Sequence, residues 1–549
     1  MGMGLAICRS IVQAHGGEIT AVPSDLGGLA LRVVWPVADG GAAAGRAGPL
    51  GRRSHGAPLA DPPGPHRRAG VRLQRHKQTG MRPSMPRIQT AAVSSVQTVI
   101  VHNPFDGTVV GEVAESTAAD VADTVLRAKA AQWEFRRSTP AVRRAMLNAL
   151  ADEISSDAET MARIISCEMG KTIREARNEV RRAQNTLRLS GDAGTFLDGE
   201  ALHCAIVEGG ADRLATITYE PVGVVGAVTP FNYPLNLLCH KLGPAIAAGN
   251  AVVAKPSPKA PLAAARLRKL ALKAGWPPAL FQIVHGGADV ALSLARSPID
   301  LLSFTGGPAA GLALKNASGL VRCLMELGGN DPLFVLPDAD LDRAVASAIG
   351  HRFEIAGQSC AAVKKLYLHR DIERVFTEKL LAAVDAVEFG DPSSDDTDMG
   401  TVIDEAAARV VEERVRATVG GGARLLHGGT RNGTVFAPTV ISGVCLDAPV
   451  IAEETFGPVI AIRTFADAGE AIAEVNAGSY GLQAGVFTND HALIRMFSRD
   501  LVVGGVMINE GPDFRAEHVP FGGVKRSGLG REGVRIALRE MSEPKVVID

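Results

Sequence analysis

The sequence predicts an α/β protein in which helices cover parallel sheets. From about residue 217 onward, short β-rich runs alternate with helical segments, which is the pattern of strands joined by crossover helices. The chain has 549 residues, of which 46 % are hydrophobic and 21 % charged, so we expect more than one globular domain.

Charge and cysteine usage exclude several classes of protein. The formal net charge is −1, which argues against binding to nucleic acid or to an anionic membrane surface. No apolar run reaches membrane-spanning length, and Met1–Gly4 lacks the basic and apolar regions of a secretion signal. The 7 cysteines are scattered without CxxC spacing, which argues against a disulfide framework or a metal site. We therefore expect a cytoplasmic protein without a metal.

The first 95 residues differ in composition from the rest. Residues 2–38, from the Gly2-Met3-Gly4 turn onward, resemble the end of a sensor histidine kinase ATP-binding domain, in which a helix and two strands follow such a turn. The segments that would bind adenine and magnesium are missing, so we interpret residues 1–38 as a fusion remnant or an over-extended start. Residues 39–95 are rich in Gly, Ala, Pro and Arg, which predicts a disordered basic linker.

Secondary structure is predicted from about residue 96 to the C-terminus. Helical periodicity predicts helices over 118–132, 139–157, 158–200, 237–248, 260–274 and 288–296. β-rich runs predict strands over 217–229, 251–255, 281–285, 301–305, 366–369, 435–441, 459–465, 485–487 and 506–509.

Two segments hold the residues that acyl chemistry requires. Cys360 ends the stretch Gly357-Gln358-Ser359-Cys360, and Glu326 lies just before the Gly328-Gly329 bend. A cysteine nucleophile and a carboxylate base can form and hydrolyse a thioester. Taken alone, such a cysteine is more often a small buried hydrophobic residue.

Three further loops follow predicted strands. The turn that contains Thr305, Gly306 and Gly307 opens a helix, so a phosphate group could approach its backbone N–H groups, although an ordinary loop fits equally. Asn232 could donate its amide to an oxyanion or simply stabilise a turn. Lys255 ends a strand at the edge where open α/β sheets bind ligands, or is a solvated lysine.

Read together, seven motifs resemble the aldehyde dehydrogenase superfamily from about residue 96 to the C-terminus. In chain order they are Pro230-Phe231-Asn232, Lys255-Pro256, Phe304-Thr305-Gly306, Glu326-Leu327-Gly328-Gly329, Gly357-Gln358-Ser359-Cys360, Glu453-Glu454-Thr455-Phe456-Gly457-Pro458 and Pro520-Phe521-Gly522-Gly523-Val524-Lys525-Arg526-Ser527-Gly528.

The resemblance implies a catalytic role for three residues. Cys360 would attack the aldehyde carbon, and Asn232 with the backbone N–H of Cys360 would hold the oxyanion. Glu326 would activate the water that hydrolyses the thioester.

The resemblance also implies NAD or NADP as the cofactor. Lys255 would bind the adenosine ribose and Glu454 the nicotinamide ribose. Pro258 stands where many NAD-preferring members have a glutamate, so we expect NADP to be tolerated. The implied cofactor-binding residues are Lys255, Ser257, Thr305, Gly306, Gly307, Leu327, Glu454 and Phe456.

The fold implied by the resemblance has three parts. A Rossmann-type cofactor domain would comprise residues 96–202 and 223–325, and an α/β catalytic domain residues 326–534. A small β arm, comprising residues 203–222 and 535–549, would join copies into a homodimer or homotetramer.

The implied substrate is a small, anionic aldehyde. The segments 398–409 and 514–518 look like phosphonoacetaldehyde dehydrogenases and are similar to phosphonoformaldehyde and lactaldehyde relatives. Arg182 and Arg515 would bind the anion. Tyr233 and Ser359 would also contact the substrate, although phosphonate-using relatives carry an arginine in place of Ser359.

Several alternatives remain open at this point. Phosphonoacetaldehyde is the first expectation, followed by lactaldehyde or succinate semialdehyde. More distant alternatives are a cofactor-independent thiol esterase and an inactive fusion protein.

Overall fold

The computed structural model describes residues 18–23, 29–34 and 97–549. The chain divides into two compact units, Met1–Thr90 and Ala91–Asp549. The first contains two antiparallel strands, β1 (Glu18–Pro23) and β2 (Leu29–Val34), in agreement with the two strands expected there. The helix expected before them and the expected basic linker lie outside the described residues.

A six-stranded sheet forms the centre of the cofactor domain, with the strand order β21-β11-β10-β7-β8-β9. All its pairings are parallel except that of β11 with β21. The strands are β7 (Val224–Val228), β8 (Ala251–Lys255), β9 (Phe281–Ile283), β10 (Leu301–Thr305), β11 (Arg322–Glu326) and β21 (Gly528–Leu529).

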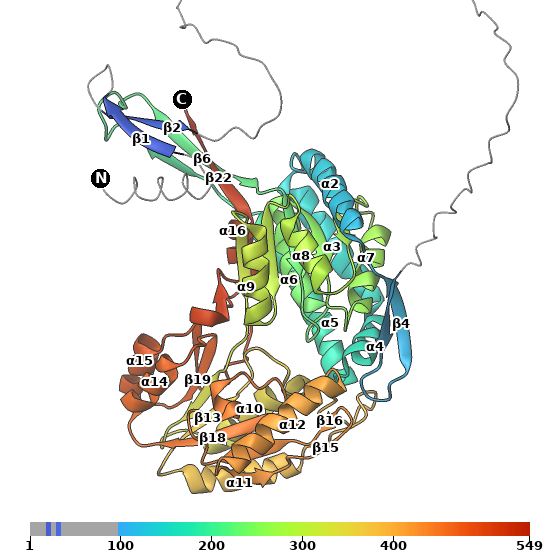
Figure 1. Ribbon diagram of the computed structural model, residues 1–549, viewed down its shortest axis with the longest axis vertical. Helices are drawn as coiled ribbons and strands as arrows, with labels where there is room; N and C mark the ends of the chain where they lie inside the picture. The colour runs from blue at the N-terminus through green and yellow to red at the C-terminus, as the bar shows by residue number, and fades with distance from the viewer. Residues whose placement is uncertain (1–17, 24–28, 35–96) are drawn as a thin grey trace, which may run out of the picture. The chain divides into compact units, whose positions relative to one another are not determined.

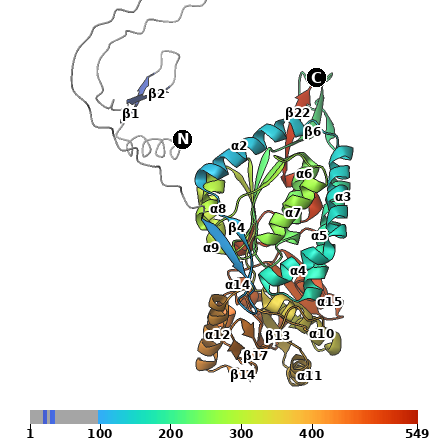
Figure 2. The ribbon, with the colours of Figure 1, turned by 90° about the vertical axis from the view of Figure 1, so that its right-hand side faces the viewer.

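Helices cover both faces of this sheet (Figure 2). Val224 and Val253 pack with α2, α8 and α9, whereas Val225 and Val252 pack with α3, α5, α6 and α7. Strand residues thus alternate between two apolar cores, which explains why these strands are hydrophobic throughout. The helices are α2 (Ala118–Phe135), α3 (Pro140–Ser156), α4 (Ala158–Met169), α5 (Ile173–Gly194), α6 (Asn236–Ala248), α7 (Leu262–Lys273), α8 (Ala288–Arg296) and α9 (Pro308–Ser318), and a hairpin of β3 (Thr98–His102) and β4 (Val109–Ala114) precedes them.

A second sheet, of seven strands, forms the catalytic domain. Its strand order is β14-β17-β18-β13-β12-β19-β20, and in Figure 1 it lies below the six-stranded sheet. Helices α10 to α12 pack on one face and α14 with α15 on the other. The strands are β12 (Pro332–Val335), β13 (Lys365–His369), β14 (Arg424–His427), β17 (Thr439–Ser442), β18 (Val459–Phe465), β19 (Gln483–Phe487) and β20 (Gly505–Ile508). The remaining elements are α10 (Leu341–Phe353), α11 (Glu373–Asp385), α12 (Glu405–Gly420), α13 (Pro449–Ala452), α14 (Ala468–Ala477), α15 (His491–Asp500), the hairpin β15 (Arg431–Asn432) and β16 (Val435–Phe436), and the 3-10 turns η1 (Glu354–Gly357) and η2 (Lys525–Ser527).

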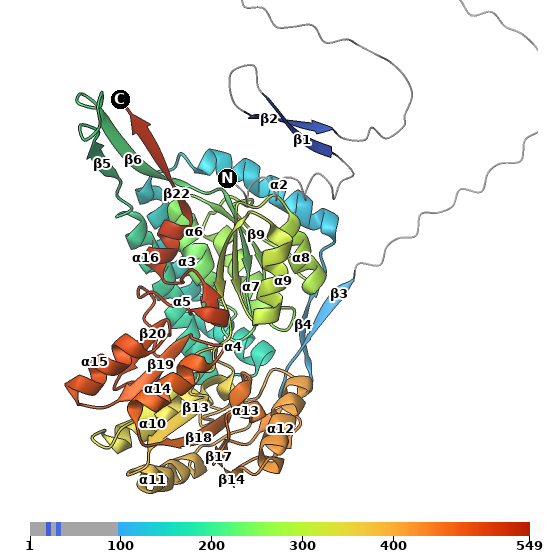
Figure 3. The same cartoon turned by 60° about the vertical axis from the view of Figure 1, so that its left-hand side comes forward.

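A three-stranded antiparallel sheet projects from the cofactor domain (Figure 3). It comprises β5 (Glu200–His203), β6 (Leu214–Pro221) and β22 (Ser542–Ile548). Leu202, Val546 and Ile548 are exposed on it. The predicted β arm therefore exists, but its role in oligomerisation stays a prediction.

The C-terminal segment corrects two predicted domain boundaries. β21, expected in the catalytic domain, pairs with β11 of the cofactor sheet. Residues 535–540, expected in the arm, belong to α16 (Val534–Glu540), which packs on α5 and α6. Burial of Val534 and Leu538 against the cofactor domain explains the difference.

Three predicted elements are each split in the structure. The helix expected over 158–200 breaks at Gly170, which has φ +80, and Thr172 caps the start of α5. The β-rich run 217–229 is divided by the Gly223 bend into β6 and β7. The strand expected over 435–441 is β16 and β17, which belong to two sheets. Residue periodicity alone does not detect these breaks.

Among the described residues, no helix has both the length and the hydropathy needed to cross a lipid bilayer.

Candidate active site

Cys360 and Glu326 meet in a cavity of about 200 Å³ at the ends of β7, β10 and β11. Glu326 is the last residue of β11, and Cys360 lies in the loop that precedes β13. Both side chains line this cavity and each affects the proton affinity of the other, so the structure brings the predicted nucleophile and base together.

A left-handed turn presents the cysteine. Ile355, Ala356 and Gly357 have φ values of 47°, 53° and 73°. This region costs a non-glycine residue about 1–2 kcal/mol, so other contacts must hold the turn. The N–H of Ile355 donates to the Glu175 carboxylate at 2.7 Å. A Cβ at Gly357 would lie 2.4 Å from the carbonyl oxygen of Gly457, so only glycine fits where this turn meets the Glu453–Pro458 motif.

Gln358 and Lys364 fix the loop on either side of the nucleophile. The Gln358 side chain donates to the carbonyl of Thr401 at 3.2 Å and accepts from the N–H of Ile403 at 2.8 Å. Lys364 Nζ donates to the carbonyl of Ser359 at 2.8 Å and forms an ion pair with Glu454 at 3.3 Å. The loop is therefore tied to the segment 398–409 and to the Glu453–Pro458 motif.

Asn232 lies where it can hold an oxyanion beside Cys360. Its Nδ2 donates to the carbonyl of Gln358 at 2.9 Å, which uses one of its two amide hydrogens. Asn232 and Cys360 both line the cavity of about 200 Å³. Within residues 97–549, the backbone N–H of Cys360 has no hydrogen-bond partner, so it is available as a second donor.

Burial shifts the proton affinities of the catalytic pair. Burial, with a smaller contribution from the nearby Glu532 carboxylate, raises the pKa of Glu326 to about 8, although Cys360, Arg515 and Lys241 oppose the shift. Burial and the Glu326 charge raise the pKa of the Cys360 thiol well above its usual value, whereas Lys364 lowers it. At neutral pH the pair is therefore held as a thiol beside a largely protonated carboxyl group.

Six of the eight predicted cofactor-binding residues line the cavity around Cys360. They are Thr305, Gly306, Gly307, Leu327, Glu454 and Phe456. Lys255 and Ser257 do not line this cavity: Lys255 is the last residue of the neighbouring strand β8, and Ser257 follows two residues later. Burial lowers the pKa of Lys255 to about 8.

The cavity suits a nucleotide cofactor on one side. Helix α9 begins beside it, and Gly307, its N-cap, provides no side-chain cap, so the first N–H groups of the helix are free for a phosphate oxygen. The carboxylate of Glu454 accepts from the N–H of Gly329 at 3.2 Å. These residues therefore fit a phosphate and a ribose.

A second, narrow cavity shares Asn232 and Cys360 with the first. All four predicted substrate-binding residues line it: Arg182, Tyr233, Ser359 and Arg515. Its free volume is about 20 Å³, room for about one water molecule, so an aldehyde must displace side chains to enter it. The remaining lining residues are Asn236, Leu237, Asp513 and Phe521.

Each of the two arginines in this cavity already has a carboxylate partner. Arg182 Nε donates to Glu517 at 2.7 Å, and Arg515 donates to Glu532 at 2.9 Å. Glu517 also contacts His240 at 2.6 Å, while Glu532 accepts from Lys241 at 2.8 Å. Burial lowers the pKa of His240 to about 4, so this histidine is neutral at pH 7.

The sequence reasoning missed Asp513, Glu517 and Glu532. Glu517 lies within the motif 514–518 and Asp513 immediately before it, so their position was a usable signal. Glu532 follows the last motif and offered no comparable signal. Long-range pairing brings Glu532 to Lys241, 291 residues away in the sequence.

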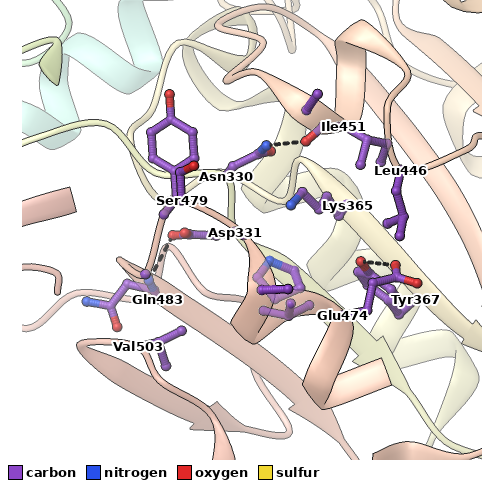
Figure 4. Close-up of a pocket in the computed structure, with 17 residues that line it drawn as sticks. Asn330, Asp331, Lys365, Tyr367, Leu446, Ile451, Glu474, Ser479, Gln483 and Val503 are labelled. Atoms are coloured by element: carbon purple, nitrogen blue, oxygen red, sulfur yellow. Dashed lines mark hydrogen bonds between the residues drawn. The ribbon is translucent and has the colours of Figure 1, made fainter. Parts of the chain in front are cut away.

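A third cavity, of about 240 Å³, lies among the first residues of β12, β13 and β19 (Figure 4). Asp331 accepts from the N–H of Gln483 at 3.1 Å, and Tyr367 donates to Glu474 at 2.7 Å. Burial lowers the pKa of the Lys365 side chain in its wall to about 8. This cavity has no lining residue in common with the two around Cys360, and it contains no predicted site residue.

Comparisons with known proteins agree with this geometry. Residues 91–547 match the sequence model described as "Aldehyde dehydrogenase family". The chain is 40 % identical to aspartate-semialdehyde dehydrogenase 1 of Pseudomonas canavaninivorans, over 81 % of this chain and 95 % of the relative. It is 38 % identical to 3-sulfolactaldehyde dehydrogenase of Priestia aryabhattai, over 82 % of this chain and 94 % of the relative.

A solved structure extends the agreement to the fold. The crystal structure of glyceraldehyde-3-phosphate dehydrogenase GapN from Methanocaldococcus jannaschii, complexed with NADP, superposes with a TM-score of 0.79. It is 35 % identical and covers 82 % of this chain and 98 % of that one. The α/β fold is confirmed, whereas the histidine kinase resemblance of residues 2–38 receives no support.

Proposed function

Because the chain belongs to the aldehyde dehydrogenase family, we propose that it oxidises a small, anionic aldehyde to its carboxylic acid with NAD or NADP. The observation that carries this proposal is that Cys360 and Glu326 line one cavity together with six of the predicted cofactor-binding residues, while Cys360 also lines a second cavity that contains two arginines.

The first half of the reaction forms a bond between sulfur and carbon. Glu326 accepts the thiol proton, and the Cys360 thiolate attacks the aldehyde carbon, whose C=O π electrons move to oxygen. Asn232 Nδ2 and the backbone N–H of Cys360 donate hydrogen bonds to that oxygen. The bound cofactor supplies a hydride acceptor, so that the carbon attached to sulfur reaches the oxidation level of a thioester.

The second half releases the acid. Glu326 first releases the thiol proton to solvent; it then accepts a proton from water, and the resulting hydroxide attacks the thioester carbon. The C–S bond then breaks, which frees the carboxylic acid, and the Cys360 thiolate takes the proton back from Glu326. Because Glu326 must be ionised to accept a proton from water, its raised pKa makes the step faster at higher pH.

The cofactor contacts follow from the lining of the first cavity. Gly306 would lie against a phosphate, and the N–H groups of Gly307 and of the first turn of α9 would donate to its oxygen, since the Gly306 N–H already donates to the Glu326 carbonyl at 3.1 Å. Glu454 would accept from a ribose hydroxyl, and Phe456 would pack against the nicotinamide ring. Lys255 would reach the adenosine ribose from the end of β8. At Pro258 no carboxylate repels the 2′-phosphate of NADP, although the neighbouring Lys259 is ion-paired with Asp404.

The choice among small aldehydes, three of which carry an acid group, is tested with a substrate panel. Phosphonoacetaldehyde, lactaldehyde, succinate semialdehyde and aspartate semialdehyde are each offered with both cofactors while NAD(P)H absorbance is recorded. Absence of NAD(P)H formation with every aldehyde would refute the proposed oxidation.

Two arginine variants test anion binding. Arg182→Ala and Arg515→Ala should raise KM for the anionic aldehydes by about 10-fold or more and leave KM for neutral propanal nearly unchanged. Arg181→Ala is the matched control, because Arg181 is on the same helix but is exposed and hydrogen-bonds only to Asn178. An equal change of KM for propanal would argue against an anion site.

We also propose that the protein works in the cytoplasm as a homodimer or homotetramer joined through the β arm. The exposed apolar residues Leu202, Val546 and Ile548 support this assignment. Analytical ultracentrifugation checks it: Val546→Lys should dissociate the oligomer, and a monomeric wild type would contradict the proposal.

A further inference from the structure

We infer that the substrate carries a hydrogen-bond donor, an ammonium or hydroxyl group, in addition to its anionic group, and that Asp513 selects for that donor. This inference rests on the proposed oxidation of an anionic aldehyde and specifies its substrate class.

Two buried atoms of opposite hydrogen-bonding character lack partners in the narrow cavity. Oδ2 of Asp513 is an acceptor without a donor, and Nε of Arg515 is a donor without an acceptor. Both residues line the cavity that contains Cys360. Buried polar groups are nearly always hydrogen-bonded in folded proteins, so an unmatched donor and acceptor in one pocket point to a ligand with both characters.

Asp513 shares the pocket with Ser359. Both residues line the narrow cavity, and Oδ2 of the Asp513 carboxylate has no partner there. Burial and the Glu354 charge raise the pKa of Asp513 to about 6, so this group is ionised at neutral pH and can only accept. An arginine in place of Ser359 would neutralise the Asp513 charge. Because this chain has serine there, the Asp513 carboxylate remains an acceptor for the substrate.

The cations beside the cavity already have carboxylate partners. Arg182 pairs with Glu517, and Arg515 and Lys241 both pair with Glu532. With these cations already paired, the second charge of a phosphonate dianion would be desolvated without a partner of its own, which disfavours it relative to a zwitterion or a hydroxy monoanion.

The substrates in two relatives' names have the inferred character. Aspartate semialdehyde has an ammonium beside a carboxylate, and 3-sulfolactaldehyde has a hydroxyl beside a sulfonate. These names support the inference, which rests on the two unpartnered atoms.

Matched aldehydes provide the test, because aspartate and succinate semialdehyde differ only in the ammonium group. Wild-type kcat/KM should favour aspartate semialdehyde by about 10- to 100-fold, the usual range for one charge-assisted hydrogen bond. In Asp513→Asn this ratio should fall to nearly one, through loss of activity on aspartate semialdehyde alone. Lactaldehyde and propanal form a second matched pair, which differs in one hydroxyl group. The ratio of their kcat/KM values should also favour the hydroxy aldehyde in the wild type and fall in Asp513→Asn.

Controls separate this inference from a structural effect. Glu510→Gln removes a carboxylate of the same loop that pairs with His351 outside the cavity, and it should leave the ratio unchanged. Asp513→Ser, which keeps a polar side chain at this position, should also abolish the preference if Asp513→Asn folds poorly in thermal melting.

Two results would overturn the inference. One is a wild-type enzyme that oxidises succinate semialdehyde as well as aspartate semialdehyde. The other is an undiminished ratio in both Asp513 variants. Either result leaves the proposed aldehyde oxidation intact, whereas a wild type that forms no NAD(P)H with any aldehyde refutes the proposed function itself.

Discussion

The two cavities that meet at Cys360 are built differently. The cofactor-side cavity is lined mainly by glycines, apolar side chains and backbone at strand ends, with Glu454 beside the catalytic Glu326. The substrate-side cavity holds Arg182, Arg515 and Asp513, and the two arginines are paired with carboxylates. Backbone groups suit a cofactor that is the same for many enzymes, whereas a set of paired charges can distinguish one small aldehyde from another.

The difference shows where the general chemistry ends and substrate choice begins. Cys360 and Asn232 line both cavities, so changes there should affect every substrate. Changes confined to one cavity should alter either cofactor or aldehyde preference alone.

Removal of the nucleophile should have the largest effect. Cys360→Ala is expected to lower kcat by about 10⁴-fold or more for every aldehyde, because no other group can form the thioester. Cofactor affinity, measured by titration calorimetry, should remain. Cys445→Ala, which removes an exposed cysteine, is the control and should retain activity. Turnover by Cys360→Ala would disprove the mechanism.

Removal of the base should separate the two half-reactions. Glu326→Gln is expected to slow hydrolysis of the thioester by about 10²- to 10⁴-fold. Thioester formation should also slow, but less, because the Cys360 thiol can lose its proton to water. Rapid-mixing absorbance should then show a slowed burst of NAD(P)H followed by still slower turnover, and mass spectrometry should detect acylated Cys360. Unchanged steady-state turnover would assign the base elsewhere.

The pH dependence of hydrolysis follows from the same residue. Burial raises the pKa of Glu326 to about 8, so the ionised base is depleted below that pH and the rate should rise from pH 6 to 9. Single-turnover measurements across this range check the slope. A rate that falls with pH, or the same slope in Glu326→Gln, would contradict this assignment.

Removal of the oxyanion donor should have a smaller effect than removal of the nucleophile. Asn232→Ala is expected to lower kcat by about 10²- to 10³-fold, the usual loss for one such donor. The loss should be the same for anionic and neutral aldehydes, because Asn232 lines both cavities. Steady-state kinetics with succinate semialdehyde and propanal check this, and selectivity in the loss would place Asn232 among the specificity residues.

The smallest expected effect concerns the cofactor alone. Pro258→Glu would place a carboxylate near the adenosine ribose and should lower the kcat/KM for NADP relative to NAD by about 10-fold, which is about 1.4 kcal/mol. Aldehyde preference should not change. Lys269→Glu, a charge change elsewhere on the cofactor domain, is the control.

Much of the fold was readable from local pattern. β8, β10, α8 and β18 have the predicted bounds, because continuous apolar runs and helical periodicity reflect local burial. The breaks at Gly170 and Gly223 and the return of β21 and α16 to the cofactor domain were missed. They depend on contacts with distant residues, which a residue pattern does not contain.

By itself, the sequence determined the family of this protein and predicted its catalytic chemistry. Cys360, Glu326 and Asn232 lie in short motifs whose order and spacing identify a family, and those residue types are sufficient to form and hydrolyse a thioester.

Only the tertiary structure decided how the two arginines of the substrate cavity are used. Arg182 and Glu517 are 335 residues apart in the chain, and Lys241 and Glu532 are 291 apart. The folded chain pairs these charges and leaves Asp513 Oδ2 and Arg515 Nε without partners. The physical reason is that a charge acts through distance and burial, and both are set by the packing of remote segments.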